Sequence, residues 1–440
     1  MNRRRFLVVS TSVVASALLA ACRGEATPTP TTAPAATPTQ APTASPPAAS
    51  PTARAVASPT LAASPTVAAS AQPFKIGVVV AQTGNLAASG RRHIQGMQLA
   101  LDELGNTAGG RRLELVPADS AGNPEQAATH VRRLVESEKV DVITGFTITP
   151  ELTAVRDYLH QQQQLTIVSI AGWPAITRDP NVRSPYIFRS SFCQGQYEFI
   201  QARWAYEKGG YRNVVMMAPD YQTGHTVAQV FGDFFKKSGG QIAAEIYPPL
   251  NTTDFGPYLQ RVLQEASNAD AVWAWFIGAD AIRFMTQYQE FGLKDQYPLL
   301  GGAEVGDDPY LPEVGEAALG IVSAINYAAR YERPQNQEFV QKFQQKFNAL
   351  PGHLEYWGYI TIMILAHALE AVKGDTSDKQ AFLDAIKNVS FEGPMNRVRF
   401  HPETKGVITT VIVRRVDRLP DGTLGNVVID EYQDIHDLSF

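Results

Sequence analysis

Lys75-Ile76-Gly77-Val78-Val79-Val80 is the stretch that decides the fold, because a short run this apolar and β-branched is typical of a strand buried on both faces. The segment that follows, residues 87–104, carries Ile94, Met97 and Leu101 on one face of a helix. A buried strand followed by an amphipathic helix predicts the first unit of a parallel α/β sheet.

The same alternation continues along the chain in two arrays. In the first array, one helix has a capping residue at Asn123 and a proline, Pro124, at its first position. The further predicted strands of this array cover residues 112–116, 140–143 and 165–170. A second array begins near residue 193, and its predicted strands cover residues 213–217, 242–247, 271–276 and 299–300.

Two such arrays predict an α/β fold with two lobes, each a mainly parallel sheet flanked by helices. Residues 335–390 predict a mostly helical region, and the chain closes with predicted strands at 407–416 and 427–429. Ligands bind outside the carboxyl ends of parallel strands, so two facing lobes predict a cleft that closes by a hinge motion.

The N-terminal region differs from the rest. Three arginines precede an apolar run that ends in small residues, which predicts a signal peptide over residues 1–21. The order Leu19-Ala20-Ala21-Cys22 resembles a bacterial lipobox, which implies lipidation of Cys22 and attachment to the membrane. The alternative is a short signal anchor with an incidental cysteine. Residues 22–73 are rich in Ala, Pro, Thr and Ser and predict a disordered tether.

Charge and motif content argue against a nucleic-acid partner and against an enzyme. The 440 residues carry a net charge of −5, or about −8 without residues 1–21, which hold three arginines and no acids. No run of basic residues stands out. The sequence contains no Gly-x-Ser-x-Gly, no His-Glu-x-x-His, no glycine-rich phosphate loop and no Cys/His cluster. We therefore expect no catalytic residue, cofactor or metal.

Several short motifs occur in a characteristic order. They are Lys75-Ile76-Gly77, Ala100-Leu101-Asp102-Glu103-Leu104, Asp119-Ser120-Ala121-Gly122-Asn123-Pro124, Asp141-Val142-Ile143-Thr144-Gly145 and Thr252-Thr253-Asp254-Phe255. Together they resemble the branched-chain amino acid and amide group of type I periplasmic solute-binding proteins, which serve ABC importers. The resemblance covers residues 74–440.

This resemblance implies a division into lobes. The first lobe would comprise residues 74–192 and 328–394, and the second lobe residues 193–327 and 395–440. Three hinge crossings would lie near residues 190–194, 325–330 and 391–398. Cys193 would then be buried at the first hinge, and Gln194 stands where the family often has an aspartate.

The resemblance also implies a set of ligand contacts from both lobes. They are Ser89, Thr147, Thr149, Ala171, Trp173, Tyr221, Thr223, Phe276, Ile277 and Glu304. Thr147 and Thr149 match positions that hold a ligand carboxylate, and a helix N-terminus there attracts anions in any case. The alternative is that both threonines only cap the helix. Glu304 matches an acid that holds a ligand ammonium, and its alternative is a solvated acid in a loop.

Departures from the family pattern bear on the ligand. Ser89 and Thr223 stand where a tyrosine is common, and Trp173 stands where a small residue is usual. A pocket reshaped in this way puts leucine, isoleucine and valine in doubt. The segments at residues 220–225 and 252–255 resemble those of relatives that bind amides and aromatic acids, which implies an aromatic carboxylate stacked on Trp173 or Tyr221. The alternative places Trp173 at the lip, packed on its neighbouring proline. Trp273 and Trp275 are interpreted as core residues.

The sequence therefore predicts an extracytoplasmic, lipid-anchored substrate-binding protein of an ABC importer. It would capture a small carboxylate or amide, such as an amino acid or an aromatic acid, by lobe closure, and would deliver it to the permease complex. The alternative is a ligand-sensing receptor that uses the same fold to serve a signalling partner.

Overall fold

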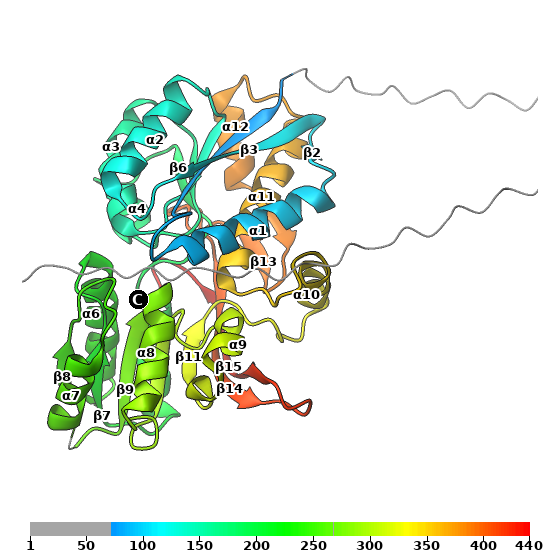
Figure 1. The fold of residues 1–440 in the computed structure, drawn as a ribbon. Helices are drawn as coiled ribbons and strands as arrows, with labels where there is room; N and C mark the ends of the chain where they lie inside the picture. The colour runs from blue at the N-terminus through cyan, green and yellow to red at the C-terminus, as the bar shows by residue number, and fades with distance from the viewer. Residues whose placement is uncertain (1–71, 267) are drawn as a thin grey trace, which may run out of the picture. The chain divides into compact units, whose positions relative to one another are not determined.

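The computed structural model describes residues 72–266 and 268–440 (Figure 1). The predicted signal peptide, the predicted lipidation site Cys22 and nearly all of the predicted tether lie outside these residues. The described chain forms two large sheets flanked by helices. A separate hairpin consists of β12 (Ser390–Glu392) and β13 (Arg397–Arg399).

The first sheet has six strands in the order β2-β3-β1-β4-β5-β6. All of its pairings are parallel except that of β2 with β3. The strands are β1 (Phe74–Val80), β2 (Thr107–Ala108), β3 (Arg111–Asp119), β4 (Val142–Gly145), β5 (Thr166–Val168) and β6 (Ile187–Arg189). The strands predicted in this region are confirmed, and β2 and β6 are additional.

Helices cover both faces of the first sheet, so β1 is buried on both sides as its sequence predicts. Ile76 and Val78 belong to the core cluster that includes α1 and α11, whereas Val79 belongs to the cluster that includes α2 and α3. Figure 1 shows the sheet between these two helix layers. The helices on this sheet are α1 (Ala87–Glu103), α2 (Pro124–Glu136), α3 (Thr149–Gln161), α4 (Ala175–Arg178), α11 (His353–Ala371) and α12 (Lys379–Lys387).

The second sheet has seven strands in the order β15-β14-β11-β10-β9-β7-β8. Strands β7 to β11 pair in parallel, and the hairpin of β14 and β15 adds an antiparallel edge. The strands are β7 (Asn213–Met217), β8 (Gln241–Ile246), β9 (Ala271–Phe276), β10 (Leu299–Ala303), β11 (Val322–Ile325), β14 (Thr409–Arg418) and β15 (Leu424–Ile435).

Helices also flank the second sheet, and alternate residues of each strand face opposite layers. Val214 and Met216 join the cluster that includes α5 and α6, whereas Val215 and Met217 join the cluster that includes α7 and α8. These helices are α5 (Gln196–Glu207), α6 (Gln222–Lys237), α7 (Gly256–Glu265), α8 (Ala279–Glu290) and α9 (Leu311–Val314).

The chain passes between the two sheets more than once. It leaves the first sheet after β6 and enters the second through α5. After β11 it continues into α10 (Pro334–Phe347) and then α11, which packs along α1, and it rejoins the second sheet at β14. We call the first sheet with its helices the first lobe, and the second sheet with α5 to α9 the second lobe.

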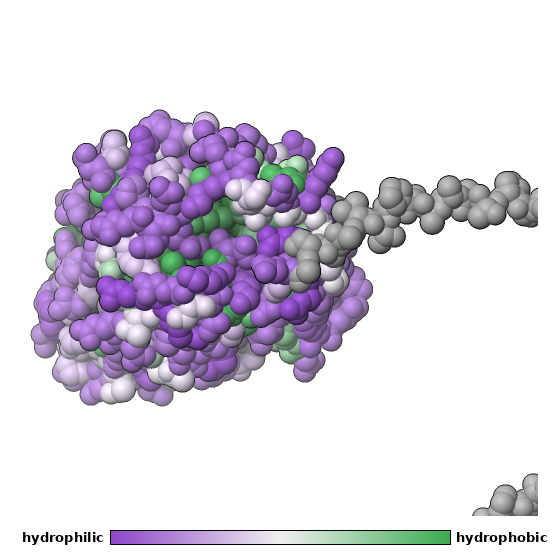
Figure 2. All heavy atoms as spheres, turned by 90° about the horizontal axis from the view of Figure 1, so that it is seen from above, coloured by the Kyte–Doolittle hydropathy of each residue, from purple (hydrophilic) through white to green (hydrophobic). Residues whose placement is uncertain are grey.

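Most large apolar side chains in these lobes are buried. Figure 2 shows a mainly hydrophilic face on which hydrophobic residues gather in a hollow near the middle. Among the described helices, none combines the length and the apolar character that a membrane crossing requires.

Candidate ligand-binding site

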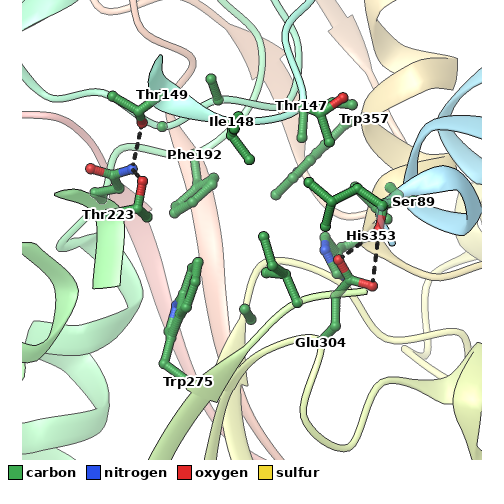
Figure 3. A pocket seen from close by; sticks show the side chains of 18 of the residues that line it. Ser89, Thr147, Ile148, Thr149, Phe192, Thr223, Trp275, Glu304, His353 and Trp357 are labelled. Carbon is green, nitrogen blue, oxygen red and sulfur yellow. Dashed lines mark hydrogen bonds between the residues drawn. The ribbon is translucent and has the colours of Figure 1, made fainter. Parts of the chain in front are cut away.

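A cavity lies where the carboxyl ends of strands from the two lobes meet. Its empty volume, including open space at its mouth, is about 580 Å³. Eight of the ten predicted contact residues line it: Ser89, Thr147, Thr149, Ala171, Tyr221, Thr223, Ile277 and Glu304. The structure thus brings together residues that lie far apart in the sequence (Figure 3).

One end of the cavity presents hydroxyl groups from both lobes. Thr149 is the first residue of α3 in the first lobe, and Thr223 lies in the first turn of α6 in the second lobe. The Gln194 side-chain amide donates hydrogen bonds to Thr149 Oγ1 (2.9 Å) and to Thr223 Oγ1 (3.1 Å). All three side chains are buried, so hydroxyl groups and two helix N-termini converge away from bulk water.

Tyr221 belongs to the same end of the cavity. Burial raises the pKa of its phenol, while a hydrogen bond with the Thr223 side chain acts in the opposite direction. The phenol therefore stays protonated at neutral pH and remains a hydrogen-bond donor.

Thr147 differs from Thr149, because the backbone N–H of Thr147 is hydrogen-bonded to an acidic side chain of the protein itself, that of Glu151. The N–H groups of Thr147 and Ile148 donate to Glu151 Oε2 at 2.7 and 3.4 Å. Thr147 Oγ1 accepts a hydrogen bond from the N–H of Ala81 at 2.8 Å. The prediction that the Thr147 N–H holds a ligand carboxylate is therefore wrong, since a carboxylate of the chain already occupies that group. The Thr147 hydroxyl still lines the cavity.

The opposite end of the cavity carries a buried carboxylate, that of Glu304. Its side chain accepts a hydrogen bond from Ser89 Oγ (3.1 Å) and another from the Tyr310 hydroxyl. Arg92 Nη1 lies 3.7 Å from Glu304 Oε2. The alternative of a solvated loop acid is wrong, because only 3% of the Glu304 surface is exposed.

Further buried charges link the lobes behind Glu304. Arg92 and His353 of the first lobe both contact Asp307 Oδ2, at 2.9 and 3.1 Å, and Arg414 of the second lobe contacts Asp307 Oδ1 at 3.0 Å. Burial by itself would raise the pKa of Asp307, but His353, Arg414 and Arg92 hold that pKa well below its usual value. This carboxylate is therefore ionised, and it ties α1 and α11 to the second lobe.

Aromatic rings form the wall between the two polar ends. Phe192 stacks on Tyr197 (centroids 5.1 Å apart, 14° between planes) and on Trp357 (5.3 Å, 11°). Trp275 completes the wall, and its side chain hydrogen-bonds with Glu198. Burial raises the pKa of Glu198 to about 7, and hydrogen bonds with the backbone and with Trp275 partly oppose that rise.

Two predicted contact residues do not line the cavity. Phe276 points to the opposite face of β9 and packs between Phe255 (5.1 Å) and Phe284 (4.7 Å). Trp173 packs, partly buried, against the core cluster that includes α2 and α3. Trp273 is a core residue, as interpreted, and donates to Gln201 Oε1 at 2.8 Å. Trp275 is a core residue too, as interpreted, and it also lines the cavity.

Several lining residues were not predicted as contacts: Leu86, Ile148, Ile170, Gly172, Phe192, Gln194, Tyr197, Trp275, Ala303, Ile325, His353, Leu354 and Trp357. His353 and Trp357 are one turn apart on α11, and the sequence places them on a helix without placing that helix beside the cavity. Within residues 72–266 and 268–440, no group of three or more His, Cys, Asp or Glu side chains is arranged to hold a metal ion.

Comparison with known proteins identifies the family. A sequence model described as "periplasmic binding protein" matches residues 73–423. The chain belongs to the periplasmic binding protein family. This periplasmic binding protein is 30% identical over 380 residues to Leu/Ile/Val-binding protein homolog 6 of Brucella melitensis, which covers 85% of this chain and 94% of that protein.

Solved structures agree with this assignment. An ABC transporter substrate-binding protein from Sphaerobacter thermophilus is 47% identical, with a TM-score of 0.79, and the match covers 84% of this chain and all of that one. A solute-binding protein of an ABC transporter from Rhodopseudomonas palustris, in complex with 3,4-dihydroxybenzoic acid, is 32% identical with a TM-score of 0.78. That match covers 83% of this chain and 99% of the other. This periplasmic binding protein is thus a substrate-binding protein of the ABC transporter type, and its family implies an extracytoplasmic location.

Proposed function

We propose that this protein captures a small aromatic carboxylate between its lobes and delivers it to the permease of an ABC importer. The observation that carries this proposal is the aromatic wall. Phe192, Trp357 and Trp275 line a cavity whose two ends are polar, so a flat ring has aromatic side chains to pack against and polar groups at its edges. The Rhodopseudomonas palustris relative in complex with 3,4-dihydroxybenzoic acid supports it.

Charge orients the ligand in this proposal. Figure 3 shows Thr149 and Thr223 on one side of the cavity and Ser89 and Glu304 on the other. A ligand carboxylate avoids the buried Glu304 carboxylate and lies at the hydroxyl end, near the positive ends of α3 and α6. A hydrogen-bond donor across the ring, such as a phenol, then faces Glu304. The ammonium of an α-amino acid sits beside its carboxylate, so one such molecule matches this separation less well.

The proposal includes attachment to the membrane. Residues 1–21 would direct export, Cys22 would carry lipid, and residues 22–73 would form the tether. The lobes would comprise residues 74–192 with 328–394 and residues 193–327 with 395–440. At about 3.1 Å per residue in an extended polyproline form, a tether of this length reaches on the order of 150 Å. That reach lets an anchored protein present both lobes to a permease in the same membrane.

Thermal unfolding of the full-length protein tests the ligand class. The protein is first unfolded and refolded to remove any bound molecule, and is then heated with benzoate, 3,4-dihydroxybenzoate, benzamide or leucine. A ligand at about 100 times its Kd adds about 2.7 kcal/mol to the free energy of unfolding, which raises Tm by several degrees. We expect this rise with the aromatic acids. A rise with leucine alone would contradict the proposal.

A further inference from the structure

Gln194 occupies a position that joins both lobes to the ligand cavity. Its backbone N–H donates to the carbonyl of Gly172 at 2.8 Å, and only 2% of the residue surface is exposed. Its side-chain nitrogen donates to Thr149 Oγ1 in the first lobe and to Thr223 Oγ1 in the second. One amide therefore uses both of its hydrogens on hydroxyl oxygens that line the cavity.

This arrangement determines the direction in which the two hydroxyl groups point. A threonine hydroxyl has one hydrogen to donate and lone pairs that accept. Because the Gln194 amide occupies a lone pair on each oxygen, neither hydroxyl hydrogen is used on Gln194: that of Thr149 remains available for a third group, and that of Thr223 is shared with the Tyr221 oxygen. Each oxygen also keeps a second lone pair, so hydrogen bonding by itself does not choose between an acceptor and a donor, and the electrostatics of this end of the cavity decide between them.

Electrostatics at this point favour an anion. Thr149 begins α3 and Thr223 lies in the first turn of α6, so the positive ends of two helix dipoles face the same end of the cavity. The buried acid of this cavity, Glu304, is seen at the other side in Figure 3. A charge-assisted hydrogen bond is stronger than a neutral one. Hydroxyl donors directed at a carboxylate therefore gain more than the same donors directed at an amide carbonyl.

We infer that Gln194 is a positioning residue that makes this site select a carboxylate over the neutral amide of the same shape. This inference rests on the proposed function, because it assumes that an aromatic ligand occupies the cavity. It assigns to Gln194 a role in specificity in addition to its role in joining the lobes. A glutamate at position 194 would accept from both hydroxyls, turn their lone pairs toward the ligand and place a negative charge beside a ligand carboxylate.

Calorimetric titration of the full-length protein at pH 8 tests this inference with a matched pair of probes, 4-hydroxybenzoate and 4-hydroxybenzamide. We expect the unaltered protein to bind the acid at least about tenfold more tightly than the amide. Gln194→Glu should weaken binding of the acid by about 100-fold or more and leave binding of the amide within about tenfold. Retained binding of the amide shows that the cavity of this variant is intact.

Two further variants separate polarity from packing. Gln194→Met keeps the length of the side chain but has no donor, so the preference for the acid should shrink to about threefold or less. Gln222→Glu adds the same charge to the exposed residue beside Thr223 and should leave both affinities within about threefold. Equal losses for acid and amide in Gln194→Glu, or an unchanged affinity for the acid, would overturn the inference. If the unaltered protein binds neither probe, it is the proposed function that fails.

Discussion

Glu304→Gln should weaken the binding of an aromatic acid that carries a ring hydroxyl and spare one that does not. The substitution keeps the size of the side chain and removes its charge. Ser89 and Tyr310 donate to this carboxylate, and a phenol of the ligand would be a third donor. A hydrogen bond to a charged group contributes about 1.5–3 kcal/mol and one between neutral groups about 0.5–1.5 kcal/mol. The difference, about 1–1.5 kcal/mol, corresponds to roughly 5- to 10-fold in Kd.

The variant should fold, because the cation beside Glu304 keeps other partners. Arg92 Nε lies 2.6 Å from Glu355 Oε1, and Arg92 Nη2 lies 2.9 Å from Asp307 Oδ2. An unpaired buried cation would strongly destabilise the fold, but removing the Glu304 charge leaves Arg92 with these two partners.

Calorimetric titration with 3,4-dihydroxybenzoate and benzoate provides the assay, and the quantity of interest is the ratio of the two Kd values. This ratio should shift by roughly 5- to 10-fold in Glu304→Gln, while Glu313→Gln, a loss of the same charge at an exposed position, leaves it unchanged. If both ligands lose affinity by the same factor, Glu304 acts on closure and not on the ring hydroxyl. An unaffected 3,4-dihydroxybenzoate would refute the reasoning outright.

Three more predictions follow from buried groups and from the N-terminal motif. Burial raises the pKa of Glu151 to about 7. Between the pKa of Glu151 in the unfolded chain and pH 7, the native state therefore binds more protons than the unfolded state. The free energy of unfolding consequently falls as the pH rises through this range, by up to about 1.4 kcal/mol per pH unit. Urea unfolding at pH 5, 6, 7 and 8 should show a smaller fall in Glu151→Gln, and an identical slope would contradict this assignment. Trp357→Ala should weaken benzoate binding by about threefold or more through loss of ring contact, as measured by titration calorimetry, whereas Trp204→Ala, outside the cavity, should not. Cys22→Ser should move the protein from the membrane fraction to the soluble fraction and abolish the lipid mass shift of its N-terminal peptide. A variant that stays membrane-bound would argue for the signal-anchor alternative.

The candidate site was predictable where a contact residue follows a strand end. Thr149 follows β4, Ile277 follows β9 and Glu304 follows β10, and all three line the cavity. The prediction was wrong for Phe276 because neighbouring residues of a strand point to opposite faces of the sheet. An error of one position therefore replaces a residue that faces the cavity with one that faces the core. The same geometry places Trp275, rather than Phe276, in the wall.

The sequence by itself determined the elements and their class, since those signals are local. The apolar run of β1 requires burial on both faces, and Asn123 caps α2 by accepting from the N–H groups of Glu125 and Gln126. Alternation of such strands and helices leads to parallel sheets because each helix brings the chain back to the end of the sheet where the previous strand began. The alternation of strands and helices also predicted that the site lies in a cleft between two lobes.

Only the tertiary structure decided which side chains meet across the cavity. Trp357 comes from a helix that follows both arrays, and it stacks on Phe192 in the first passage between the sheets. Gln194 contacts Thr149 and Thr223, one from each lobe. No local pattern encodes these contacts, because they depend on how two separately formed sheets dock and on where the chain passes between them. The polarity of the hydroxyl end and the shape of the aromatic wall are therefore properties of the assembled lobes.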